Sequence, residues 1–172
     1  MSCGLTSDSP LKFSLLEENT RRIFSEVASP GQTLESLPGK AGGLPSSNYE
    51  ALAADTVDKL YAYDEGTVLF KPTKASDEQF RLSEAEAASY FVTGIVPEDH
   101  GFAIQPWSDV RFENAGVILD CNSAIVMGNY YFTDAETGEE AKAEFTFGYR
   151  RDVAGNLLIN LHHSSFPHIA TN

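Results

Sequence analysis

Leu157-Leu-Ile-Asn-Leu-His-His-Ser-Ser-Phe-Pro167 is predicted to be a β-strand that changes from aliphatic to histidine and hydroxyl side chains at its C-terminal end. Three further β-rich segments precede it along the chain, near Trp107–Leu119, Ser123–Thr133 and Ala141–Arg151. The short segments between them are rich in Asp, Asn and Gly, which are turn-forming residues. Four strands joined by short turns predict an antiparallel meander, and this part of the chain decides the fold.

Two predicted helices precede the meander. Ser46 or Ser47 can cap a helix that runs to Tyr61, and Ser83 can begin another that Gly94 closes. A short strand near residues 67–70 lies between them. Helices followed by a run of strands predict an α+β domain, in which the helices pack on one face of a curved antiparallel sheet. Such a cone-shaped fold has an interior that suits a small ligand.

The first 45 residues are predicted to be separate from this domain. Residues 1–12 read as a lead-in, residues 13–28 carry apolar side chains at helical spacing, and residues 31–45 form a loop rich in Gly, Pro and Ser. We therefore expect an N-terminal lead-in over residues 1–45 and one functional domain over residues 46–172.

The net charge and the distribution of apolar residues limit the kinds of molecule that this protein is expected to bind. The chain has 172 residues and a formal net charge of −13, which would repel both nucleic acid and an anionic membrane. It contains no run of about 18 apolar residues, and its start lacks a basic segment followed by an apolar one. These features predict a cytoplasmic protein whose partner is a small molecule or another protein.

Side chains alternate across a strand, so His162 and His163 must point to opposite faces. Only His162 with Ser164, or His163 with Ser165, can share one cavity. Neighbouring histidines on a strand cannot both bind one ion, and no Asp or Glu follows Leu157. A catalytic zinc usually takes three protein ligands, so we predict no metal and no other cofactor. A serine nucleophile is also disfavoured, because no third acidic group is placed to orient the histidine.

Seven short motifs occur in order along the chain. They are Phe70-Lys-Pro-Thr-Lys-Ala75, Ala88-Ser-Tyr-Phe91, Gly101-Phe-Ala-Ile-Gln-Pro-Trp107, Val110-Arg-Phe-Glu-Asn-Ala-Gly116, Met127-Gly-Asn-Tyr-Tyr-Phe132, Glu144-Phe-Thr-Phe-Gly-Tyr149 and Leu161-His-His-Ser-Ser165. Through these motifs the chain resembles the iota-class carbonic anhydrases over about residues 46–168. That class is similar to the association domain of calcium/calmodulin-dependent protein kinase II and belongs to the nuclear transport factor 2-like superfamily.

The resemblance implies a cone-shaped, nuclear transport factor 2-like (cystatin-like) α+β fold and a homodimer formed through the outer face of the sheet. It also implies that position 163 faces the interior, which selects the pair His163 and Ser165. The family's other functional hydroxyls fall on Thr73 and Tyr90. The positions that arginines occupy in the pocket of the kinase association domain correspond to His163, Tyr130 and Thr146 of this chain. The resemblance therefore implies that neutral hydrogen-bonding groups and one titratable histidine replace fixed positive charges.

These residues suit the reversible hydration of carbon dioxide to bicarbonate without a metal. We expect His163 to act as the base toward the attacking water, because the pKa of an unperturbed histidine lies near neutrality. Thr73, Tyr90 and Ser165 would hold the oxygens of carbon dioxide and bicarbonate, as an oxyanion hole does. Tyr130 and Thr146 would also contact the substrate, and Tyr130, Phe70 and Phe132 would form an apolar wall.

Two other functions stay open from the sequence. One is a non-catalytic association or small-acid-binding domain, which would need cationic pocket residues that the inward positions do not supply. The other is an isomerase or hydrolase of the same superfamily with an inward acidic base. Glu144 shares a strand face with Thr146 and is the candidate for that base.

Overall fold

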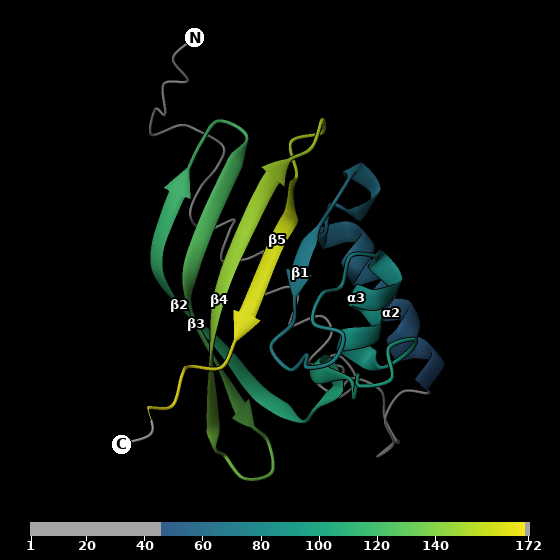
Figure 1. Cartoon of the computed structure of the whole chain (residues 1–172), viewed down its shortest axis with the longest axis vertical. Helices are drawn as coiled ribbons and strands as arrows, with labels where there is room; N and C mark the ends of the chain where they lie inside the picture. The colour runs from purple at the N-terminus through teal and green to yellow at the C-terminus, as the bar shows by residue number, and fades with distance from the viewer. Residues whose placement is uncertain (1–45, 171–172) are drawn as a thin grey trace, which may run out of the picture.

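A computed structural model describes residues 46–170, which form a curved five-stranded sheet with two helices against one face (Figure 1). The strands lie in the order β1-β5-β4-β3-β2. The predicted helix at residues 13–28 and loop at residues 31–45 lie outside the described residues. The predicted α+β class is confirmed.

Consecutive strands of the meander are antiparallel, and their bounds agree with the predicted segments within two residues. They are β2 (Trp107–Leu119), β3 (Ser123–Asp134), β4 (Glu140–Arg151) and β5 (Leu157–Ser165). The sheet departs from the predicted antiparallel arrangement only at one edge. There β1 (Leu69–Lys71) pairs in parallel with β5, and Lys71 lies opposite His163. The long connection from β1 through a helix and three strands permits this parallel pairing.

Helix α2 (Ser46–Leu60) and helix α3 (Glu84–Val92) lie side by side against the sheet (Figure 1). The start of α3 is fixed by a capping box, in which Ser83 and Glu86 each bind the other's backbone N–H. The last residue of α3 is Val92, two residues before Gly94, which was predicted to close the helix. Two short 3₁₀ helices complete the structure, η1 (Tyr63–Glu65) and η2 (Phe102–Ile104).

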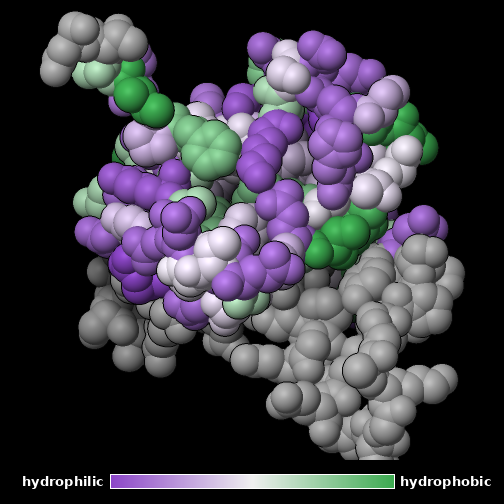
Figure 2. All heavy atoms as spheres, turned by 90° about the horizontal axis from the view of Figure 1, so that it is seen from below, coloured by the Kyte–Doolittle hydropathy of each residue, from purple (hydrophilic) through white to green (hydrophobic). Residues whose placement is uncertain are grey.

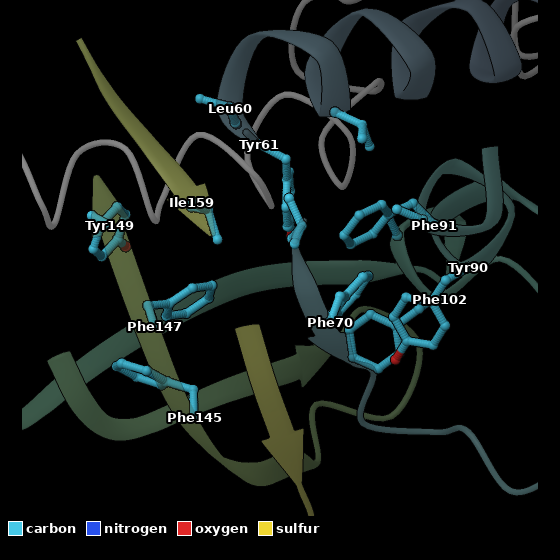
Figure 3. Packing of buried hydrophobic residues seen from close by; sticks show 14 of the residues in the cluster. Leu60, Tyr61, Phe70, Tyr90, Phe91, Phe102, Phe145, Phe147, Tyr149 and Ile159 are labelled. Atoms are coloured by element: carbon cyan, nitrogen blue, oxygen red, sulfur yellow. The ribbon is translucent and has the colours of Figure 1, made fainter. Parts of the chain in front are cut away.

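The core between helices and sheet is rich in aromatic rings. Figure 3 shows Tyr61, Phe91 and Tyr90 on the helix side of Phe70, with Phe145, Phe147 and Tyr149 along β4. Neighbouring rings among them pack at centroid distances between 5.2 and 6.4 Å, in tilted, edge-on or stacked pairs. Aromatic pairs of this kind stabilise a core beyond the area they bury. The positions of functional side chains between these rings are therefore tightly constrained.

The surface differs from one face to another. Hydrophilic residues dominate the face seen from below, with only scattered apolar ones among them (Figure 2). The sheet face turned away from the helices carries exposed apolar side chains, including Leu69, Ile118, Ile125 and Met127. Among residues 46–170, no helix has the length and apolar character needed to cross a membrane.

A β-bulge in β5 reverses which side chains face the core. Gly148 of β4 lies opposite Leu161, whereas Tyr149 lies opposite Ile159, so one extra residue stands in β5 at Asn160. Gly148 has no room for a side chain, since a Cβ atom there would come within 2.8 Å of the Leu161 Cβ atom. Leu157 and Ile159 are buried before the bulge, while His162 and Ser164 are buried after it.

The predicted inward placement of His163 and Ser165 is therefore wrong. Uninterrupted alternation from the buried Leu157 and Ile159 would have turned both residues inward, but the bulge turns them outward. His163 is exposed and Ser165 is partly exposed. Thr146, which lies directly opposite His163, and Glu144 share this outer face. Glu144 is exposed, so it does not have the inward orientation that the isomerase or hydrolase alternative requires.

Candidate active site

Four hydroxyl side chains from four parts of the chain meet inside the cone. They are Thr73 from the loop after β1, Tyr90 from α3, Tyr130 from β3 and Ser164 from β5, and we call them the hydroxyl cluster. Thr73 Oγ1 lies 2.5 Å from Ser164 Oγ and 3.5 Å from the Tyr130 hydroxyl. The Tyr130 hydroxyl donates to Ser164 Oγ, and the Lys74 backbone N–H donates to the Tyr90 hydroxyl over 3.3 Å. The strand pairing of β3, β4 and β5 thus brings distant hydroxyls together.

All members of the hydroxyl cluster are buried. Ser164 and Tyr130 are each 1% exposed and Tyr90 is 4% exposed, whereas Thr73 is 8% exposed and lies nearest to solvent. Burial raises the pKa of Tyr130 to about 12 and also raises the pKa of Tyr90, against the opposing effect of hydrogen bonds from Lys74 and Thr73. Both phenols therefore keep their protons near neutral pH. They can donate hydrogen bonds to an oxygen that becomes negatively charged.

Aromatic rings stand directly beside these hydroxyls. The Tyr90 ring stacks on Phe102 at 5.5 Å and meets Phe70 edge-on at 5.8 Å, while Tyr130 meets Phe132 at 4.9 Å. The predicted wall of Phe70, Phe132 and Tyr130 lines this region, and Phe102 extends it. An apolar wall beside hydrogen-bond donors suits a small neutral molecule that gains charge as it reacts.

The histidine inside the cone is His162. Its ring lies between Phe70 and Phe147, with centroids 4.5 and 4.2 Å away, and its Nδ1 atom is 2.8 Å from the Tyr61 hydroxyl. Its Nε2 atom is buried and has no hydrogen-bond partner within residues 46–170. Burial, assisted by the charge of His163, lowers the pKa of His162 to about 3. His162 is therefore neutral near pH 7 and a weak base.

The lowered pKa of His162 predicts a loss of stability in acid. Below about pH 6.5 an exposed histidine takes up a proton. His162 therefore becomes protonated in the unfolded chain but stays neutral in the folded protein, which favours unfolding. The free energy of unfolding should therefore fall by up to about 1.4 kcal/mol per pH unit between pH 6.5 and pH 3, and this contribution should be absent above pH 6.5. His162→Phe keeps a ring between Phe70 and Phe147 and should remove this fall.

Urea unfolding at several pH values measures this effect. The difference in unfolding free energy between His162→Phe and the wild type should shift in favour of the variant as the pH is lowered from 7 to 4. His163→Gln, on the exposed neighbour, is the matched control and should retain the wild-type dependence. Parallel pH profiles for the wild type and His162→Phe would show that another group causes the acid sensitivity.

The remaining predicted site residues gather on the opposite face of the sheet. His163, Ser165 and Thr146 line a hollow of about 420 Å³ there, together with Glu144 and Asn129. Six predicted site residues are thus divided by the sheet. Thr73 and Tyr130 lie inside and contact Ser164, which belongs to the pair that the resemblance did not select. Tyr90 also lies inside, where its hydroxyl accepts a hydrogen bond from the Lys74 backbone N–H. His163, Ser165 and Thr146 lie outside.

One group of carboxylates among the described residues has its oxygens close enough together to hold a cation. It consists of Asp58, Asp64 and Glu84, at the surface where α2, η1 and α3 begin or end. Desolvation raises the pKa of Glu84, and the nearby charges of Asp58 and Asp64 add to this effect. None of the three belongs to the hydroxyl cluster. Exposed acidic groups commonly occur without a bound ion, so we assign no site to them.

Comparison with known proteins connects this arrangement with a family. Residues 40–166 match the family model described as metal-independent carbonic anhydrase. A protein of Nostoc sp. strain PCC 7120 named metal-independent carbonic anhydrase is 33% identical over 169 residues, which cover 95% of this chain and 82% of that protein.

Two solved structures are also similar to this chain. A cyanobacterial iota-carbonic anhydrase, crystallised with bicarbonate, is 31% identical and has a TM-score of 0.79, with 93% of this chain and 94% of that chain covered. A nuclear transport factor 2-like protein from Salmonella enterica is 10% identical and has a TM-score of 0.50, with 91% of each chain covered. At that identity the second likeness concerns the fold alone. It agrees with the first in confirming the predicted nuclear transport factor 2-like fold.

Proposed function

Because the chain belongs to the metal-independent carbonic anhydrase family, we propose that its hydroxyl cluster interconverts carbon dioxide and bicarbonate. The observation that carries this proposal is the meeting of Thr73, Tyr90, Tyr130 and Ser164 beside a wall of aromatic rings. The crystallised cyanobacterial relative binds bicarbonate and shares the fold. A cluster of neutral donors beside apolar rings suits both the neutral gas and its anionic product.

Bicarbonate would enter this site by replacing hydrogen bonds that the hydroxyls now make with one another. Thr73 Oγ1 and Ser164 Oγ are 2.5 Å apart, so no atom fits between them while that bond persists. Each hydroxyl can both donate and accept, so the exchange leaves no buried polar atom without a partner. The protonated phenols of Tyr90 and Tyr130 are proposed to donate to the oxygen that takes up negative charge.

The reaction needs a path for one proton. Water attacks the carbon of carbon dioxide, a carbon–oxygen bond forms, one C=O π pair moves onto oxygen, and the water proton must leave. His162 is a poor acceptor, because its pKa of about 3 lies well below that of a histidine suited to this role. We propose that Ser164 and Thr73 relay the proton toward solvent, since Thr73 is the most exposed member of the hydroxyl cluster.

Metal independence has a direct test. Protein treated with a strong chelator, with its metal content measured on the same sample, should hydrate carbon dioxide at the rate of untreated protein. Stopped-flow mixing with a pH indicator provides the rate. Activity that disappears on chelation and returns with zinc would contradict the proposed mechanism. Catalysis by zinc requires a bound water whose pKa is lowered to about 7.

The isomerase or hydrolase alternative loses its candidate base, because Glu144 lies on the outer face of the sheet. The small-acid-binding alternative would need a free cation inside the cone. Arg81, which is fully buried, is already paired with Asp99 at 2.7 Å. Neither alternative therefore has an observation in its favour that the carbonic anhydrase proposal lacks.

We further propose that two copies associate through the outer face of the sheet. Ile125, Met127 and Leu69 are between 44% and 57% exposed on that face, and burying such side chains would stabilise a dimer. Sedimentation of the purified protein measures the assembly, and a monomer at micromolar concentration would contradict it. We also propose that the protein binds neither nucleic acid nor an anionic membrane, because its net charge of −13 would repel both.

A further inference from the structure

The loop of residues 75–80 follows Thr73 and Lys74 directly and contains no helix or strand. Residues 76–80 are all exposed, so packing contributes little to the position of this loop. The hydroxyl of Thr73 itself lies 2.5 Å from Ser164 Oγ. Small displacements of a positioned group can lower a reaction rate greatly. Some other interaction must therefore hold the loop.

The carboxylate of Glu98, from the loop after α3, provides that interaction. It accepts hydrogen bonds from the backbone N–H groups of Ser76, Asp77 and Glu78 at 2.8, 3.2 and 2.8 Å, and from the Ser76 hydroxyl at 2.6 Å. These bonds lower the pKa of Glu98 to about 2, so the carboxylate stays charged. One side chain thus satisfies three consecutive N–H groups of an otherwise exposed loop.

Glu98 is in turn connected to the helix that carries Tyr90. Its carboxylate lies 3.7 Å from Arg81 Nη2, and that guanidinium pairs with Asp99 at 2.7 Å. The second oxygen of Asp99 accepts from the Ser89 hydroxyl at 2.8 Å, and Ser89 immediately precedes Tyr90 in α3. The two adjacent carboxylates therefore connect the loop next to Thr73 with the helix turn next to Tyr90.

We propose that Glu98 is a positioning residue for the hydration reaction. It holds residues 76–78, and through them it fixes the Thr73 hydroxyl against Ser164 and the Lys74 N–H against Tyr90. The inference rests on the proposed function, because it assigns Thr73 to the reaction. Glutamine at position 98 keeps the shape of the side chain but replaces one acceptor oxygen with an NH₂ donor. Fewer of the three N–H groups can then be satisfied, and the loop gains other conformations.

Glu98→Gln should lower kcat for carbon dioxide hydration about tenfold. Asp77→Asn is the matched control: it removes one negative charge from the loop that Glu98 holds, its own side chain is exposed, and its rate should stay within twofold of the wild type. Amide hydrogen exchange at residues 76–78 should be at least about tenfold faster in Glu98→Gln, because exchange reports local opening. This readout does not depend on any activity.

A double-mutant cycle with Thr73→Ala separates positioning from a general structural role. Once the Thr73 hydroxyl is absent, Glu98→Gln should lower kcat less than twofold further. An equal loss in both backgrounds, or no loss in the wild-type background, would overturn the positioning role. Full activity of Thr73→Ala alone would overturn the proposed site instead. Whatever the activity of Thr73→Ala, amide exchange at residues 76–78 that is the same in Glu98→Gln and the wild type would show that Glu98 does not anchor the loop.

Discussion

Ser164→Ala is expected to lower kcat for carbon dioxide hydration by about 100-fold, the usual loss when one hydrogen-bonding group of an oxyanion site is removed. Ser164 Oγ bonds both Thr73 and Tyr130, so the variant removes the central link of the hydroxyl cluster. Tyr130 loses the hydrogen bond that it donates to Ser164, and the proposed relay from water to Thr73 is broken. Stopped-flow hydration with a pH indicator measures the rate, and circular dichroism checks that the fold is retained.

Ser165→Ala is the matched control, because it makes the same chemical change one residue further along the strand. Ser165 lies on the outer face beside His163, and its removal should leave kcat within about twofold of the wild type. The opposite outcome, with Ser165→Ala inactive and Ser164→Ala active, would move the site to the outer hollow. That result would also restore His163 and Thr146 as candidates.

The strands themselves could be predicted from the sequence, because each long segment combines β-forming residues with turn residues at both ends. The start of α3 was equally readable from Ser83 and Glu86. The short strand near residues 67–70 was also predicted, but its parallel pairing with β5 was not, since the periodicity of a strand carries no information about its neighbour. That pairing depends on contacts between residues about 90 positions apart in the chain.

The site was half predictable. Thr73, Tyr90 and Tyr130 were placed through a family resemblance, and they lie together. His163 and Ser165 were wrongly placed inside because a bulge shifts the side-chain alternation of β5 by one residue. No residue within 157–165 indicates that bulge. The available signal lay on the partner strand. Gly148 interrupts an otherwise bulky segment, and a glycine inside a strand often marks a bulge.

Other features needed three-dimensional coordinates because they depend on long-range contacts. The low pKa of His162 follows from burial between two rings that stand 92 and 15 residues away in the chain (Phe70 and Phe147). Glu98 and Asp99 read as ordinary surface acids in a loop. Their partners, the backbone of Glu78 and the side chain of Arg81, come from residues 76–81, which lie beside that loop only in the folded structure.

Asp99→Ala is expected to lower the free energy of unfolding by about 3 to 5 kcal/mol, since it leaves a buried charge without its partner. The side chains of Arg81 and Asp99 are both 0% exposed, so water cannot replace the lost carboxylate at the guanidinium. The Ser89 hydroxyl loses its acceptor as well. Glu98, 3.7 Å from Arg81, is at the edge of the loop and compensates only in part. Such a loss is a large share of the 5 to 15 kcal/mol that stabilise a typical domain.

Urea unfolding measures this loss, and Asp55→Ala is its control. Asp55 pairs with Lys59 at 2.5 Å, closer than the buried pair, but both side chains are more than half exposed. An exposed pair contributes at most about 1 kcal/mol, because water solvates either charge when the other is removed. The two substitutions therefore make the same chemical change in two different environments. Equal losses would show that burial does not decide the effect, and the Arg81–Asp99 pair would then have no special part in holding the loop against α3.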